Sequence, residues 1–381
     1  PKEKYGTAMA IYGMGIIMAP ILGPIMGGWI ADNLSWRWIY YINLPVGMLS
    51  ILLAYLTIED PPYLKKERLK IDYPGIILLA LGIGCLQIVL DKGQREDWFE
   101  SKFIVMLSII SAVSLALMLW WELKKAEHPI VNLRLFKDRN FFFGNLVMFF
   151  TFINLFGSII LLPIYVQSLM GYTAFLAGLV LGPAGVIQLI AFPISGKISE
   201  KINPKIPLAF GIIMCAYSTY LMSLFSLQAD FWSFVYPRAV LAIGMSFTIT
   251  PLAVMTVAFI PKEKMQDATP LSGVIRNIGG SLGTAIVTTI ISQRAQFHQF
   301  RLIENLTPYD ISYQIAIEKL NEYLSVRSFL SPEGAIYREL IRQAQAIAFN
   351  EAFWILSIGM ISMLLTVLLF RRPLYRRKGE A

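Results

Sequence analysis

The feature that most constrains this chain is a series of long apolar blocks. Most of them run for about 18 residues or more with almost no charge, which is the length that an α-helix needs to cross a hydrocarbon core about 30 Å thick. The blocks do not alternate apolar and polar residues, as the strands of a membrane barrel would. We therefore predict an all-α, polytopic transmembrane helix bundle. The ten predicted spans are 6–31, 38–57, 73–91, 103–122, 142–168, 173–195, 207–227, 231–258, 270–293 and 351–370.

The composition agrees with a membrane protein. Hydrophobic residues make up 56% of the chain and charged residues 15%, whereas an average soluble domain has about 25% charged residues. Cys85 and Cys215 lie inside apolar blocks, so no disulfide framework is predicted. With His128 and His298 in distant loops, no metal site is predicted either. A phosphate-binding G-x-x-x-x-G-K-[ST] loop is missing from the sequence, which argues against ATP-driven transport.

Positive charge predicts the orientation of the helices. If the N-terminal end lies in the cytoplasm, the inner segments carry 21 of the 33 Lys and Arg residues, and the short outer loops carry 4. Cytoplasmic loops of membrane proteins hold an excess of Lys and Arg. Both ends of the chain, including the basic tail 371–381, are therefore expected in the cytoplasm. The net charge of +8 follows from this topology and requires no nucleic-acid partner.

Two connections between spans are long enough to have structure of their own. Residues 123–141 form a cytoplasmic link whose apolar side chains predict a stretch lying at the membrane surface. Residues 294–350 form a large outer loop, in which 311–324 and 335–348 have the spacing of amphipathic helices. Ser331 begins the break between these two helices and is expected to cap the second. The outer loop is either a functional element or a solvated hairpin without a partner.

The first span contains an unusual series of glycines and prolines. The series consists of Gly15, Pro20, Gly23, Pro24, Gly27 and Gly28. Gly23 and Gly27 are four residues apart and share one helix face, so they predict the close approach of a neighbouring helix there. The prolines remove backbone donors and permit a bend. One such glycine pair would indicate only ordinary helix packing, whereas the whole series is much more specific.

This series resembles the antiporter motif of the major facilitator superfamily. The segment that follows, WRWIYYINLPVG at 36–47, is similar to the same region of EmrB/QacA-type drug–proton antiporters, which have fourteen helices. Further similarity runs to the end of the chain, at 129–133, 139–141, 171–173 and 276–283.

The resemblance implies that the chain begins just before the family's fifth helix, with the first four helices absent. Residues 1–57 would then be the remnant of an N-terminal bundle, and 58–122 an inserted transmembrane helix pair. The link 123–141 would lead to a complete C-terminal six-helix bundle at 142–370, which includes the outer loop 294–350.

The resemblance also implies two sites that control access to the transport path. The glycine-rich first span would lie at the interface between the bundles, against Gly178, Gly182 and Pro183 of the sixth span. Close packing there would seal one side of the protein during alternating access.

The loop after the sixth span resembles the cytoplasmic gate of the superfamily. The expected gate residues are Gly196, Glu200, Lys201 and Lys205. Asn203 stands where Gly is usual, and Asn tolerates a left-handed turn better than most residues. These charges either form salt bridges that hold the gate or are simply the positive charges of a cytoplasmic loop.

Polar, charged and flexible side chains within the spans are the candidates for a substrate cavity. They are Asn154, Gln188, Met245, Thr248, Arg238, Arg276 and Asn277. A lining rich in aromatic and Met side chains suits varied apolar compounds. Alternatives stay open, because the two arginines can snorkel to the membrane boundary and apolar residues can face lipid.

Two further patterns bear on the chemistry. No carboxylate stands near the middle of any predicted span, so proton coupling is implied by the resemblance and not by these residues. The GGSLG segment at 279–283 matches a hydrolase pattern, but it lies in an apolar helix and not on a strand-to-helix turn. No enzyme is therefore predicted.

These observations predict a secondary active multidrug efflux transporter in a bacterial inner membrane. It would export hydrophobic compounds in exchange for protons by alternating access, without a cofactor and in contact with membrane lipid. The resemblance implies a periplasmic adaptor protein bound at 294–350. The alternatives are a metabolite or siderophore exporter of the same fold, or a truncated chain that binds partners and transports nothing.

Overall fold

The protein is a bundle of long helices in the computed structural model, which describes residues 22–57, 72–124, 133–261, 264–304, 306–307, 309–324 and 331–371. Within these residues all regular structure is helical, and nine helical segments are long and apolar enough to cross a membrane. The prediction of an all-α membrane bundle is confirmed. The first predicted span, 6–31, lies mostly outside the described residues, and its last part is a helix at 22–33.

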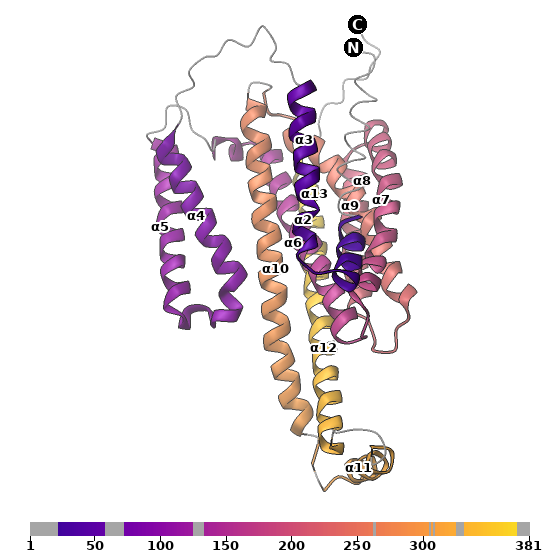
Figure 1. Ribbon diagram of the computed structural model, residues 1–381. Helices are drawn as coiled ribbons and strands as arrows, with labels where there is room; N and C mark the ends of the chain where they lie inside the picture. The colour runs from indigo at the N-terminus through magenta and orange to yellow at the C-terminus, as the bar shows by residue number, and fades with distance from the viewer. Residues whose placement is uncertain are drawn as a thin grey trace.

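The membrane-length helical segments that follow this helix alternate in direction (Figure 1). In chain order the elements are α2 Trp38–Tyr41, α3 Asn43–Thr57, α4 Tyr73–Lys92, η2 Gly93–Glu96, η3 Trp98–Glu100, α5 Lys102–Lys124, η4 Leu133–Lys137, α6 Arg139–Ser168, α7 Ala174–Lys201, α8 Lys205–Met222, α9 Phe231–Val257, α10 Met265–Glu304, α11 Ile311–Leu324, α12 Pro332–Ser362 and α13 Leu364–Leu369.

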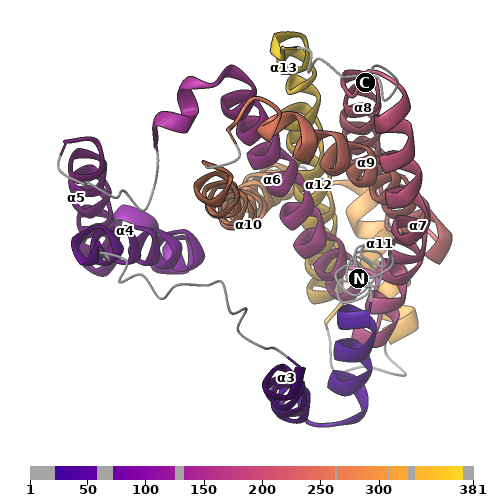
Figure 2. The ribbon, with the colours of Figure 1, turned by 90° about the horizontal axis from the view of Figure 1, so that it is seen from above.

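Helices α6 to α10 and α12 gather into one bundle (Figure 2). Its core contains a fully buried ring, Tyr165, whose centroid lies within 6 Å of those of Phe225, Phe234 and Phe349. Such aromatic groups bury large apolar areas in preferred tilted or edge-to-face arrangements. The bundle therefore has a packed interior of its own.

Glycines set the closest helix contacts in this bundle. A methyl group on Gly279 of α10 would lie 2.7 Å from the carbonyl oxygen of Phe149, and one on Gly283 would lie 2.6 Å from that of Ile153. Both oxygens belong to the backbone of α6 and cannot rotate away. Small residues thus allow α10 and α6 to approach backbone to backbone, as in many membrane helix pairs.

The α4–α5 hairpin lies to one side of the bundle and contacts α10 (Figure 2). Ser281 Oγ donates to Gln87 Oε1 at 2.5 Å, and Gln94 Nε2 donates to Ser292 Oγ at 3.1 Å. These two side-chain bonds join α4 and η2 to α10. Helix α3 stands apart from the bundle in the same view, and among the described helices it packs chiefly on α2.

The predicted outer loop at 294–350 is largely a continuation of transmembrane helices, which corrects the predicted boundaries. Helix α10 continues to Glu304, and α12 runs without a break from Pro332 into the last span, because neither stretch contains an interior helix breaker at the membrane boundary. Ser331 Oγ accepts a hydrogen bond from Gly334 N at 3.2 Å and caps α12, as predicted. Helix α11 has the predicted bounds. Together the outer parts of α10 and α12, with α11, form a projection, at the bottom of Figure 1.

The described part of the cytoplasmic link packs against the ends of the bundle helices through one of its apolar side chains. Leu135 in η4 is buried in a small cluster with Phe141, Ile260 and Leu271. Its apolar side chain therefore covers the ends of the bundle helices. Residues 125–132 of the link lie outside the described residues.

Candidate functional site

Helix 22–33 packs on the start of α7 through direct backbone contact, and we call this contact the seam. A methyl group on Gly28 would overlap the carbonyl oxygen of Ala174, and one on Gly178 would overlap the carbonyl oxygen of Pro24. Next along α7, a methyl group on Gly182 would lie 2.8 Å from Ile25 Cδ1. Each helix thus supplies a glycine where the other supplies a carbonyl.

The face of helix 22–33 that meets α7 differs from the predicted face. A methyl group on Gly23 or Gly27 meets no described atom within 4 Å, whereas Gly28 is buried. The reason is geometric, because residues 24 and 28 share a different face of the helix from residues 23 and 27. The prediction of a close neighbour at Gly23 and Gly27 is not met among the described residues.

The other residues proposed for this interface contribute less or lie elsewhere. Pro183 follows Gly182 inside α7 and is half-buried. Gly15 and Pro20 lie outside the described residues.

Asp32 closes one end of the seam. Its two carboxylate oxygens accept hydrogen bonds from Ala174 N at 3.2 Å and Phe175 N at 2.7 Å. The first amides of a helix have no partner within the helix, and a negative charge at this end is favoured by the helix dipole. The carboxylate therefore joins two segments that are 142 residues apart in the chain.

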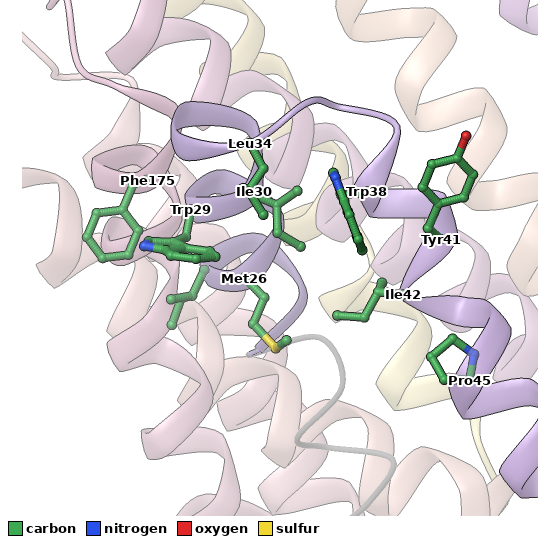
Figure 3. Close-up of a pocket in the computed structure, with 10 residues that line it drawn as sticks. Met26, Trp29, Ile30, Leu34, Trp38, Tyr41, Ile42, Pro45 and Phe175 are labelled. Carbon is green, nitrogen blue, oxygen red and sulfur yellow. The ribbon is translucent and has the colours of Figure 1, made fainter.

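An apolar pocket of about 510 Å³ adjoins the seam. Its wall is formed by helix 22–33, by α2 and α3, and by Phe175 of α7. Figure 3 shows Met26 and Ile30 pointing toward Trp38 and Ile42, with Trp29 beside Phe175. Such a lining suits apolar surfaces, since pockets for lipophilic molecules are mostly apolar and aromatic.

Four of the seven candidate cavity residues lie inside the C-terminal bundle. Asn154 is 1% exposed and its amide donates to Thr219 Oγ1 at 3.3 Å and to Leu356 O at 3.4 Å. Met245 and Thr248 are also fully buried. In this conformation these side chains hold α6, α8, α9 and α12 together.

Arg238 is the fourth buried candidate, and it does not snorkel. It is 8% exposed, and its Nη1 donates to Ser158 Oγ at 2.9 Å, which links α9 to α6. Its head group is thus held inside the protein.

The remaining three candidates are accessible. Arg276 and Asn277 are exposed on α10, and Gln188 is half-buried on α7. The Arg276 guanidinium lies 5.4 Å from the centre of the Phe152 ring of α6, a cation–π contact. Depth and residue type could identify Arg276 as a candidate from the sequence, but its contact with Phe152 depends on how the helices pack.

The predicted gate residues lie mostly in helix and not in a loop. Gly196, Glu200 and Lys201 belong to the end of α7, and Lys205 begins α8. Asn203 does not adopt a left-handed conformation. Instead its Oδ1 accepts from Lys205 N at 3.2 Å, so a side-chain bond makes the turn.

A charged cluster joins α10 and α12 at the base of the projection. Arg294 donates to both carboxylate oxygens of Glu351, and His298 Nε2 lies 3.0 Å from one of them. Among the described residues, no group of three or more His, Cys, Asp or Glu side chains could hold a metal ion.

Sequence reasoning missed Asp32 and Asn140. Asn140 is fully buried and bonds to Met255 O and to both backbone groups of Arg371. The signal for each was a polar residue at the end of an apolar block. The partners of Asp32 and Asn140 could not be identified from the sequence, because they lie more than 100 residues away along the chain.

Comparisons with known proteins agree with this architecture. The model of the Major Facilitator Superfamily matches residues 1–284. The chain is 35% identical to the multidrug export protein EmrB of Escherichia coli K12 over 380 residues, which are 100% of this chain and 73% of that protein. It is 32% identical to the fatty acid resistance protein FarB of Neisseria gonorrhoeae over 382 residues, which cover 100% of this chain and 74% of that protein.

A solved structure has the same fold. It is a bacterial homologue of the human lysosomal transporter Spinster in an inward-facing, occupied conformation, with a TM-score of 0.52 and 14% identity over 97% of this chain and 70% of that one. The similarity covers the helical bundle and nearly all of the chain. This multi-pass membrane protein therefore belongs to the Major Facilitator Superfamily, a family of transporters and not of enzymes, and within it to the EmrB-type proteins.

Proposed function

We propose that this chain exports hydrophobic compounds across a bacterial inner membrane in exchange for protons, by the rocking of two helix bundles. The observation that supports this proposal best is the seam. At Gly28 and Gly178 the two helices meet glycine against backbone, with no side chains between them. They can part as rigid bodies, which is what alternating access requires.

The substrate class is proposed from two kinds of observation. The similar proteins EmrB and FarB are named for multidrug export and for fatty acid resistance, and a fatty acid is a molecule with a large apolar part. The pocket beside the seam is lined almost wholly by apolar side chains. Gln188, Arg276 and Asn277 are the accessible polar side chains that we propose for the substrate path.

The proton gradient as the energy source rests on the resemblance. The cytoplasmic location of both chain ends rests on the distribution of Lys and Arg residues. In this orientation the projection extends into the outer compartment. The 40 residues of α10 make a helix about 60 Å long, roughly twice the thickness of a hydrocarbon core.

We further propose that the projection binds an accessory protein in the outer compartment. Phe300 is 72% exposed and Tyr309 is 91% exposed on it. A second apolar pocket of about 550 Å³ lies between the end of α10, α11 and α12, lined by side chains such as Leu302, Leu320 and Leu340. Apolar surface outside the membrane is characteristic of protein interaction sites.

Transport can be tested with purified protein in liposomes that contain a pH-sensitive dye. The protein should be expressed with any residues that its gene encodes before Pro1. We expect ethidium, a permanent cation that carries no proton of its own across the bilayer, to cause proton movement in these liposomes and not in protein-free liposomes. Identical traces from the two preparations would contradict proton-coupled export of this compound.

A further inference from the structure

The N-terminus of α7 has two caps, and only one of them belongs to its own part of the chain. Thr173 Oγ1 accepts from Leu176 N at 3.3 Å, which is an ordinary local cap. Asp32 accepts from the two preceding amides, Ala174 N and Phe175 N. Because Thr173 is already in place, α7 does not need Asp32 in order to begin where it does.

The Asp32 contact exists only while the seam is closed. Gly28, one turn before Asp32, is the residue that touches the Ala174 backbone. Any movement that separates these backbones by a few ångströms also breaks both hydrogen bonds of Asp32, whereas the Thr173 cap moves with α7. The stabilisation from the Asp32 carboxylate is therefore available to the closed arrangement alone.

The chemistry of the contact suits a reversible latch. A carboxylate at a helix N-terminus combines charge-assisted hydrogen bonds with the helix dipole. Asp32 is also exposed, so water can replace its partners when the contact opens. Both properties give a bond of moderate strength that can form and break in each transport cycle.

We propose that Asp32 is a positioning residue that latches the seam shut at the end of the bundle that carries the projection. This role presupposes the alternating access proposed above. The partner of the latch is the backbone of Ala174 and Phe175.

Distances between spin labels on the two sides of the seam test this role. Ser35 and Gln228 are exposed. Ser35 follows helix 22–33 on one side of the seam, and Gln228 precedes α9, which packs on α7 on the other side. Both can be changed to cysteine for labelling after the two native cysteines are replaced as Cys85→Ser and Cys215→Ala. Double electron–electron resonance in lipid nanodiscs then gives the ratio of long to short distances.

The key comparison is between Asp32→Ala and Thr173→Ala. Loss of an N-cap of this kind changes an equilibrium by about 2- to 30-fold, so we expect Asp32→Ala to raise the ratio of long to short distances by that factor. Asp32→Asn keeps a side-chain oxygen and should raise the ratio less. Thr173→Ala weakens the same helix end without cutting the link across the seam, so it should leave the ratio unchanged.

The outcomes separate the latch from the proposed transport cycle. If the wild-type protein shows both distances but Asp32→Ala and Asp32→Asn leave their ratio unchanged, the latch is overturned while rocking stands. An equal rise with Thr173→Ala would also overturn it, since the effect would then be simple helix capping. If the wild-type protein and all variants show one short distance with and without decanoate, rocking and the latch both fail.

Discussion

Gly28 is the position at which the seam can be disturbed most sharply by a single methyl group. In Gly28→Ala the new carbon would overlap the carbonyl oxygen of Ala174 and lie 2.7 Å from its carbonyl carbon and 3.0 Å from Phe175 Cα. All three are backbone atoms, so no side-chain rotation relieves the overlap. Overpacking of this kind costs about 1–3 kcal/mol, which corresponds to a shift of about 5- to 150-fold toward the open seam.

Hydrogen exchange at single amides measures this shift. Ala174 N and Phe175 N are bonded to Asp32 across the seam, whereas Leu176 N is bonded to Thr173 within α7. In Gly28→Ala we expect exchange at the first two amides to quicken by about 5- to 150-fold, because exchange reports the open fraction. Exchange at Leu176 should not change.

Gly27→Ala is the matched control for this prediction. A methyl group there meets no described atom within 4 Å, and the higher helix propensity of Ala acts equally on the open and closed arrangements. Exchange at Ala174 and Phe175 should therefore match the wild type. The reasoning is refuted if Gly28→Ala leaves these amides unchanged, or if Gly27→Ala affects them as strongly.

Three other predictions follow from the geometry. Asn140→Ala removes three hydrogen bonds of a fully buried amide and should lower the free energy of unfolding by about 1.5–4.5 kcal/mol, seen as a lower melting temperature; an unchanged value would contradict this. Gly283→Ala should lower the free energy of unfolding by about 1–3 kcal/mol in the same assay, since its methyl group would lie 2.6 Å from a backbone oxygen. A methyl group on Gly273 meets open space, so Gly273→Ala should leave the free energy of unfolding unchanged. Hydrogen bonds from the hydroxyl and backbone amide of Ser233 hold the pKa of Asp230, just before α9, below its ordinary 3.8. This cap therefore stabilises α9 above about pH 4 and loses its effect as the pH falls through the lowered pKa; a carbon-13 titration should show a higher pKa in Ser233→Ala, and an unchanged pKa would count against the hydroxyl bond.

The sequence predicts the helices well because the membrane imposes a minimum apolar length on each of them. Helix Lys102–Lys124 extends the predicted span 103–122 by one residue at its start and two at its end. Helix Arg139–Ser168 starts three residues before the predicted span 142–168 and ends at the same residue. Helix α11 was predictable because its amphipathic spacing is bounded by turn residues. The continuous helices of the projection were harder to predict, because a polar stretch beyond the membrane can be helix or loop.

The partners of each helix face could not be predicted. Helical spacing shows that Gly23 and Gly27 share a face, but nothing local shows that α7 meets the Gly28 face instead. Asn154 and Arg238 have the residue types expected of a cavity, yet both are buried between helices. Asp32 acts on amides 142 residues away, a distance at which the sequence pattern carries no information about contact.

The central claim, proton-coupled export, is tested most directly by substrate accumulation in bacterial cells that lack their own efflux pumps. Cells that express the protein, together with any residues encoded before Pro1, should accumulate less ethidium or decanoate than cells with an empty vector. A protonophore should abolish the difference. If the protein reaches the membrane and accumulation still equals that of the empty vector, or if the difference persists with the protonophore, the claim is contradicted.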